Sequence, residues 1–155
     1  MYIFFFLKRF FLLVFLSAIF YQIAEAQNRI AFPLKQSENH RYLTDQNNKP
    51  VFLNGDTPWS LGYKASMKEV RDYLQDRKQK GINALIIQIT PSNLLFDTLT
   101  HGDLPNFYNE HVFVNRDIAK PNEAYFKHID SVFALCNEMN FAILLAPLYE
   151  GCCED

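Results

Sequence analysis

The sequence carries little net charge and few cysteines. Its 15 Lys and Arg residues nearly balance its 17 Asp and Glu residues, which gives a net charge of −2. This near-equal number of positive and negative side chains argues against nucleic-acid binding, which needs many cations against a row of phosphates.

The three cysteines are Cys136, Cys152 and Cys153. Because their number is odd, at least one has no partner within the chain. Cys136 falls on the apolar face of a predicted helix, as a small core residue does.

Several motifs of catalysis and cofactor binding are missing. The sequence has no G-x-G-x-x-G turn, no G-x-x-x-x-G-K phosphate loop and no G-x-S-x-G nucleophile elbow. Its histidines, His40, His101, His111 and His128, are scattered, without a pair at the spacing of a zinc motif. Neither a metal site nor a cofactor is therefore expected.

The N-terminus reads as a secretory signal peptide over residues 1–26. Lys8 and Arg9 precede an apolar run over residues 10–23, and the Ala-Glu-Ala at residues 24–26 suits cleavage before Gln27. The alternative is a retained anchor, since residues 1–23 are nearly long enough to span a bilayer. Cleavage predicts an exported protein, periplasmic, cell-surface or extracellular, without stable membrane association. It leaves about 129 residues, enough for one domain.

The first part of the exported chain, residues 27–50, is polar and rich in turn signals. The "TDQNNKP" stretch lies between the short apolar pieces "RYL" and "VFL" and predicts a small hairpin. Residues 51–54 then read as the first buried strand. A helix follows over residues 66–80, with a capping box formed by Ser66 and Glu69, an apolar face that includes Val70 and Leu74, and a stop at Gly81.

The rest of the chain continues the alternation of strands and helices. The continuous apolar run at residues 83–89 predicts a buried parallel strand. A second helix begins after Asn122, with an apolar stripe of Phe126, Ile129, Val132, Phe133, Cys136 and Met139, and stops near Asn140. Residues 141–149 predict a third strand. Residues 91–120 form a long connection without strong periodicity, and loops of this length are usually functional or partly disordered.

Strand, helix, strand, helix, strand is the order that places three neighbouring strands in one parallel sheet. A doubly wound sheet and a (β/α)8 barrel both begin this way, and the missing glycine-rich turn favours the barrel. A barrel needs about 250 residues and eight strands. We therefore expect residues 51–155 to be the truncated N-terminal part of a (β/α)8 barrel, with about three βα units, preceded by the hairpin.

Polar and aromatic side chains stand at the predicted strand ends, where α/β barrels bind their ligands. They are Asp56, Trp59, Gln88, Asn93, Tyr149 and Glu150. An aromatic plate beside carboxylates and amides suits a sugar, whose C–H face stacks on the ring while its hydroxyls need directed partners. Each side chain also has a structural interpretation: an Asx turn for Asp56, the core for Trp59, backbone partners for Gln88 and an exposed loop for Tyr149 and Glu150.

The runs "YLTDQNNKPVFLNGDTPWSL", "EVRDYLQDRKQKGINALIIQI" and "PNEAYFKHIDSVFALCNEMNFAILLAPLY" together resemble the opening of the apiosidase-like catalytic domain of bacterial glycoside hydrolases. The resemblance implies a (β/α)8 barrel that hydrolyses glycosidic bonds in plant cell-wall polysaccharide, including release of apiose from pectin side chains. It also implies an oligo- or polysaccharide partner and a sugar subsite at Asp56 and Trp59.

Barrel glycosidases of this kind use two carboxylates, and the resemblance places them on later strands, beyond Asp155. We therefore expect this part to be inactive alone, and Asp56 and Glu150 are not assigned as catalytic. Two alternatives stay open. One is a non-catalytic carbohydrate-binding or degenerate remnant of such a barrel, and the other is a doubly wound binding domain.

Overall fold

The structure is a computed structural model that describes residues 14–15, 29–91 and 104–147. The chain divides into two compact units, Met1–Phe52 and Leu53–Asp155. Most of the predicted signal peptide lies outside the described residues, as do Cys152 and Cys153. No helix within the described residues is long and apolar enough to cross a membrane.

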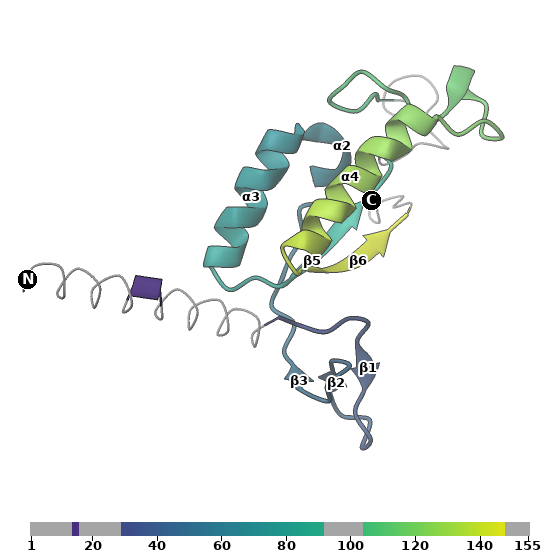
Figure 1. The fold of residues 1–155 in the computed structure, drawn as a ribbon. Coiled ribbons are helices and arrows are strands. Elements are labelled where there is room, and N and C mark those ends of the chain that lie inside the picture. Colours follow the sequence, from purple (N-terminus) through teal and green to yellow (C-terminus); the bar gives the residue numbers. More distant parts are fainter. Residues whose placement is uncertain (1–13, 16–28, 92–103, 148–155) are drawn as a thin grey trace, which may run out of the picture. The chain divides into compact units, whose positions relative to one another are not determined.

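The first unit holds a small antiparallel sheet (Figure 1). Its strands are β1 (Lys35–Gln36), β2 (Leu43–Thr44) and β3 (Pro50–Val51), in the order β1-β2-β3. Asp45 shapes the turn between β2 and β3, because its Oδ1 accepts hydrogen bonds from the amides of Asn47 (2.8 Å) and Lys49 (2.9 Å). The predicted hairpin is confirmed, and β1 is an additional strand that the sequence did not predict.

The prediction of a first buried strand at residues 51–54 is wrong. Val51 belongs to β3 and pairs with Leu43 in the antiparallel sheet, while Phe52 is 83% exposed. The first parallel strand is instead β4 (Gly55–Asp56). A three-residue apolar run has no periodicity that separates a buried strand from a hairpin edge, so the sequence pattern placed the boundary four residues too early.

The second unit is a parallel sheet with helices between its strands (Figure 1). Its order along the chain is β4, α2 (Leu61–Lys64), α3 (Met67–Gln79), β5 (Ala84–Gln88), the 3-10 turn η1 (Val114–Arg116), α4 (Glu123–Glu138) and β6 (Ala142–Ala146). The sheet order β4-β5-β6 confirms that consecutive strands are parallel neighbours. The short helix α2 was not predicted, since four residues are too few for a periodic pattern.

The helix ends follow their sequence signals. Both hydrogen bonds of the capping box between Ser66 and Glu69 are present at the start of α3, and Asn122 caps α4 by accepting from the amide of Ala124. Gly81 after α3 and Asn140 after α4 adopt the left-handed conformation, with φ values of 77° and 63°. These signals are local, which is why the sequence alone located them.

The core lies between the helices and one face of the sheet. Figure 1 shows α3 and α4 side by side, with α4 next to the strands β5 and β6. Buried residues of the main cluster include the predicted Val70, Leu74, Val132 and Cys136, together with Leu61, Leu85, Ile87, Leu135 and Phe141. Burial raises the pKa of the Cys136 thiol to about 12, so this cysteine is an inert core residue.

The stripe predicted for α4 is rotated slightly from the observed one. Ile129, Val132 and Cys136 are buried as predicted, but Tyr125 and Leu135 are buried in addition. Phe126, Phe133 and Met139 are only partly buried. The hydroxyl of the buried Tyr125 is satisfied, because it donates a 2.6 Å hydrogen bond to the carbonyl oxygen of Ile89, beyond the end of β5.

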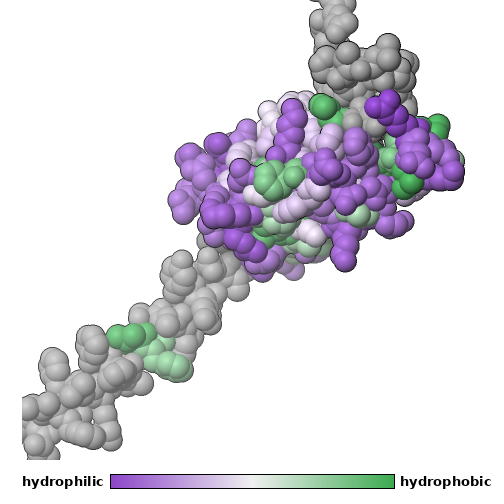
Figure 2. Space-filling model, turned by 90° about the horizontal axis from the view of Figure 1, so that it is seen from above, coloured by the Kyte–Doolittle hydropathy of each residue, from purple (hydrophilic) through white to green (hydrophobic). Residues whose placement is uncertain are grey.

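The face of the molecule in Figure 2 is mostly hydrophilic, with apolar residues in small separate patches. Strand β6 has more apolar surface exposed. Its neighbouring residues Leu144 and Leu145 are 46% and 49% exposed, and successive side chains of a strand point to opposite faces. Both faces of β6 therefore carry accessible apolar surface in the described structure.

Gly62 gives a test of how closely α2 packs on the sheet. A Cβ atom at this position would lie 3.0 Å from the carbonyl oxygen of Gln88 and 3.3 Å from side-chain atoms of Ile87 and Ile129. We expect Gly62→Ala to lower the free energy of unfolding by about 1–3 kcal/mol through overpacking, measured by urea denaturation. Gly55→Ala is the control, because the nearest atom to its added Cβ is 3.8 Å away. Equal stability of the two variants would show that α2 can shift away from the sheet at little cost and is not tightly packed on it.

Candidate functional site

The carboxyl ends of the three parallel strands meet at one edge of the sheet. The amide of Gln88, the last residue of β5, donates a 3.1 Å hydrogen bond to the carbonyl oxygen of Trp59. On the other side, the Thr90 hydroxyl donates a 2.9 Å bond to the carbonyl oxygen of Pro147, just after β6. These bonds hold the chain segments that leave β4, β5 and β6 next to one another at this edge.

Trp59 stands beside an open concavity of about 520 Å³. Trp59 is 38% exposed, so part of this residue packs on the protein while part faces solvent. The concavity is lined by residues 57–61, which leave β4 and enter α2, and by Lys64, Ala65, Glu69 and Tyr73. An exposed aromatic face with hydroxyl and charged groups around it can stack on a sugar ring and bind its hydroxyl groups.

The two charged residues that line this concavity, Lys64 and Glu69, differ in how far their charged groups are already bound within the chain. The Glu69 carboxylate is held in the capping box, where its Oε2 accepts from both the amide and the hydroxyl of Ser66, at 2.7 Å each. Lys64 contacts only the ring of Tyr63, with its Nζ 5.9 Å from the ring centroid, among the interactions of the described residues. The lysine ammonium is therefore the more available group for a ligand.

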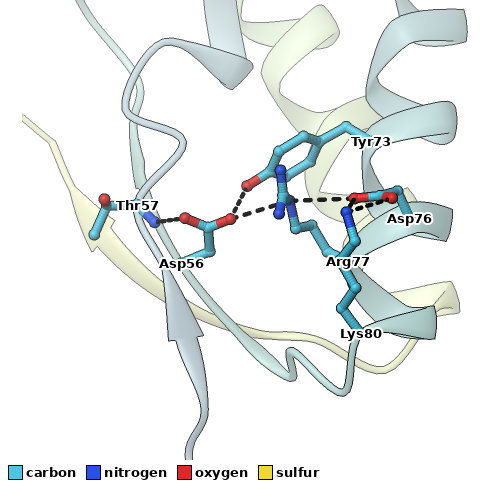
Figure 3. A network of polar contacts seen from close by, with 6 residues as sticks. All are labelled: Asp56, Thr57, Tyr73, Asp76, Arg77 and Lys80. Atoms are coloured by element: carbon cyan, nitrogen blue, oxygen red, sulfur yellow. Dashed lines mark hydrogen bonds and ion pairs between the residues drawn. The ribbon is translucent and has the colours of Figure 1, made fainter.

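The Asp56 side chain faces α3 (Figure 3). Its Oδ1 accepts a 2.8 Å hydrogen bond from the amide of Thr57, and its Oδ2 accepts one of 2.8 Å from the hydroxyl of Tyr73. Arg77 Nε lies 3.1 Å from the same Oδ2 as an ion pair, although its N–H is not aligned for a hydrogen bond. Both carboxylate oxygens are thus engaged within the chain.

The network around Asp56 extends along α3. The Arg77 guanidinium also lies over the Tyr73 ring, 4.9 Å from its centroid, and its Nε is 3.7 Å from Asp76 Oδ2. Asp76 in turn pairs with Lys80 at 2.8 Å. Figure 3 shows this chain of contacts running from the end of β4 along the helix. These contacts hold β4 against α3, so the network stabilises the fold.

The contacts of Asp56 fix the protonation states of the network. The hydrogen bond from Tyr73, the amide of Thr57 and the charge of Arg77 together lower the pKa of Asp56. Desolvation, and then the hydrogen bond to Asp56, raise the pKa of Tyr73 to about 12. At neutral pH the pair is therefore a carboxylate that accepts from a neutral phenol. A carboxyl group held ionised in this way is a poor proton donor.

The second half of the long connection packs against the starts of the helices. The Tyr108 hydroxyl accepts a 3.1 Å hydrogen bond from the amide of Met67, at the start of α3, and the amide of Phe107 donates a 2.8 Å bond to the carbonyl oxygen of Tyr63 in α2. Tyr108 also packs edge-to-face on His128 of α4, with ring centroids 5.1 Å apart. This part of the loop is therefore an ordered wall beside the site.

The structure brings two of the predicted site residues together. Trp59 and Gln88 are linked through their backbones, and Gln88 is only 1% exposed. Asp56 lies at the same strand end, but its side chain contacts α3. Asn93, Tyr149 and Glu150 lie outside the described residues. No cluster of three possible metal ligands is found in the parts of the chain that the structure describes.

Lys64 and Tyr73 line the concavity and were missed by the sequence analysis. Lys64 lies on the unpredicted helix α2, so no pattern placed it near Trp59. Tyr73 lies on α3 at a position that is neither on the predicted apolar face nor on the charged face. A signal for it existed in the spacing, because Tyr73 and Arg77 are four residues apart and share one side of the helix.

The bond between Tyr73 and Asp56 predicts a stability effect. Tyr73→Phe removes only the hydroxyl that donates to Asp56, and we expect it to lower the free energy of unfolding by about 1 kcal/mol, measured by thermal unfolding. The control is Asp72→Asn, which breaks an exposed ion pair with Lys68 on the same helix and should cost less. A larger loss in the control would show that the network does not anchor β4.

The lowered pKa of Asp56 predicts a dependence on acid. A carboxyl whose pKa is lower in the folded state stabilises that state above its unfolded pKa of 3.8, and this contribution is lost as the pH falls through the folded value. In Asp56→Asn the contribution is absent at every pH. We expect the stability difference between the original protein and this variant to shrink as the pH falls below about 5 and through the folded pKa of Asp56, in urea midpoints. A constant difference would refute the assignment.

Comparison with known proteins connects this geometry to a family. A family described as "Apiosidase-like, catalytic domain" matches residues 37–155. A solved structure of a glycoside hydrolase has a TM-score of 0.62 at 22% identity, over 75% of this chain and 25% of that chain. A glycoside hydrolase family 5 structure from Bacteroides vulgatus gives 0.60 at 22% identity, over 74% and 24%. The search of curated proteins found no match.

This chain therefore spans about a quarter of the length of the two solved structures. The likeness supports the fold, a parallel βαβ sheet with helices on one face, and the family match covers both the second unit and the end of the first. On this match the chain belongs to the family of apiosidase-like catalytic domains.

Proposed function

We propose that this chain forms the first part of a (β/α)8 barrel that binds and hydrolyses plant cell-wall polysaccharide, including release of apiose from pectin side chains. The observation that carries the proposal is the match of an apiosidase-like catalytic domain to residues 37–155. The parallel order β4-β5-β6 supports it, because consecutive neighbouring strands are how such a barrel begins. The family implies a carbohydrate substrate.

Within this proposal, Trp59 holds the sugar. The ring stands at the carboxyl end of the sheet, where α/β barrels bind ligands, and its backbone is fixed to β5 by Gln88. Lys64 and the hydroxyl groups that line the same concavity would then be near the sugar and could bind its hydroxyl groups. Gln88, Tyr149 and Glu150 remain proposed members of the subsite from the neighbouring strand ends.

Asp56 has a supporting role in the proposal. Its carboxylate already accepts hydrogen bonds from Thr57 and Tyr73 and pairs with Arg77. Asp56 therefore shapes the loop that carries Trp59, and Trp59 makes the main contact with the sugar. A glycosidase needs one carboxyl group that donates a proton and a second that attacks or activates water. We propose that this acid pair comes from strand ends other than β4, and that residues 1–155 alone do not hydrolyse the substrate.

We also propose that the protein is exported. The basis is the sequence of residues 1–26, with its two cations, apolar run and small-residue cleavage pattern. An extracellular or periplasmic place agrees with a polymeric substrate that cannot enter the cytoplasm. Mass spectrometry of the protein isolated from its source would test this point, and a mature N-terminus at Gln27 is the expected result. An intact Met1 would contradict cleavage.

The sugar site is tested on the full-length protein with apiose-containing pectic oligosaccharides and with cello- and xylo-oligosaccharides as probes. We expect Trp59→Ala to weaken binding about tenfold, the effect of losing one aromatic stacking face, with little change in melting temperature. Isothermal titration calorimetry and thermal unfolding measure the two quantities. Trp59→Phe is the matched control, because it keeps a ring at the same position and should retain most of the affinity.

Three outcomes separate the readings of this site. Loss of binding and of melting temperature together in Trp59→Ala would place the indole in the core. Unchanged binding would remove Trp59 from the subsite. Binding without any release of apiose or other sugar by the full-length protein would favour the carbohydrate-binding remnant over the hydrolase.

A further inference from the structure

The first unit has a concavity of its own, of about 550 Å³, over its small sheet. Strand β1 supplies Lys35 and Gln36 to its wall, and the turn at residues 37–40 supplies a second side. Tyr42, Thr44 and Asn48 complete the lining. All these residues belong to Met1–Phe52, so this site is separate from the concavity at Trp59.

The wall of this concavity is held in shape before any ligand binds. The Ser37 hydroxyl accepts from the amides of Arg41 (3.3 Å) and Tyr42 (3.2 Å) and donates to Asn39 Oδ1 (2.9 Å). A further hydrogen bond of 2.9 Å joins His40 Nδ1 to Gln36 Oε1. A wall fixed by its own hydrogen bonds loses little conformational entropy on binding.

Other lining groups are left to face a ligand. Tyr42 is 48% exposed. Asn48 is exposed in the turn between β2 and β3, with a φ of 61°. Within the described residues, the side chains of Glu38, Tyr42 and Asn48 have no hydrogen bond or ion pair. The concavity thus offers an aromatic face, an amide, a phenol and a carboxylate at the same time.

The charges of the lining select the kind of ligand. Lys35 and Glu38 are of opposite sign, so the lining has no excess of positive charge for a phosphate or a polyanion. Tyr42 is the single large apolar side chain among the lining residues, which is too little for a hydrophobic segment of another protein. An aromatic plate with mixed donors and acceptors fits a neutral polyhydroxylated ring, which stacks its C–H face and directs its hydroxyls outward.

We propose that this concavity is a second, non-catalytic carbohydrate site that binds neutral oligosaccharides. The lining residues alone indicate a neutral sugar, and only its origin in plant cell-wall polysaccharide rests on the proposed function. Tyr42 stacks on the sugar ring, while Asn48 and Glu38 bind its hydroxyl groups. Such a site would hold the polymer near the protein independently of the subsite at Trp59.

The test is a titration of the whole protein with cellohexaose, xylohexaose and arabinohexaose, followed by ¹H–¹⁵N NMR and by calorimetry. We expect amide shifts at residues 35–42 and 48 with at least one of these probes, and an affinity about tenfold lower in Tyr42→Ala. Phe52→Ala is the matched control, because Phe52 is an aromatic residue of the same unit, 83% exposed and outside the lining. It should bind as the original protein does.

Further variants make every outcome decisive. Tyr42→Phe keeps the ring and should keep most of the affinity, which separates stacking from a folding defect. Trp59→Ala should leave the shifts at residues 35–42 unchanged. Shifts confined to the surroundings of Trp59 would overturn this proposal while leaving the proposed function standing. Shifts confined to residues 35–42 and 48 would support this proposal, and the subsite at Trp59 is then decided by the separate titration with apiose-containing oligosaccharides. No shift at residues 35–42 and 48 with any probe would overturn this proposal. Stronger binding of trigalacturonate than of the neutral probes would overturn the assignment of a neutral ligand.

Discussion

Burial of the central strand β5 is the constraint on which the second unit depends. Leu85 and Ile87 are fully buried under the helices, and burial of each such side chain stabilises the fold by about 1.5–3 kcal/mol. The backbone of the same strand pairs with β4 on one side and with β6 on the other. Gln88 at its end then holds the segment that carries Trp59. The core and the candidate site therefore share one strand.

Local signals in the sequence were enough to predict most elements around β5. The capping box at Ser66, the stop at Gly81 and the cap at Asn122 depend on contacts within one or two turns, so the sequence contains the whole cause. The continuous apolar run of β5 likewise indicated a buried parallel strand. The parallel order then follows from the connections, because each helix must return the chain to the same edge of the sheet.

The features that were missed depend on contacts between distant residues. Val51 joins β3 because Leu43 is its partner across the hairpin, and no property of residues 51–54 alone reveals this. The direction of the Asp56 side chain is decided by Tyr73 and Arg77, seventeen and twenty-one positions away. Trp59 and Gln88 could be predicted as members of one edge, but the position of Lys64 required the helix α2, which leaves no periodic trace.

Strand β6 leaves apolar surface accessible in the described structure. Leu144 and Leu145 remain about half exposed on opposite faces of this strand. If full burial of a leucine is worth about 1.5–3 kcal/mol, then about 1 kcal/mol of hydrophobic free energy is still available at each of them. A neighbouring strand and helix that covered both faces would gain this stabilisation without any change in β6 itself. Any element that packs on β6 would thus gain stability from these two side chains.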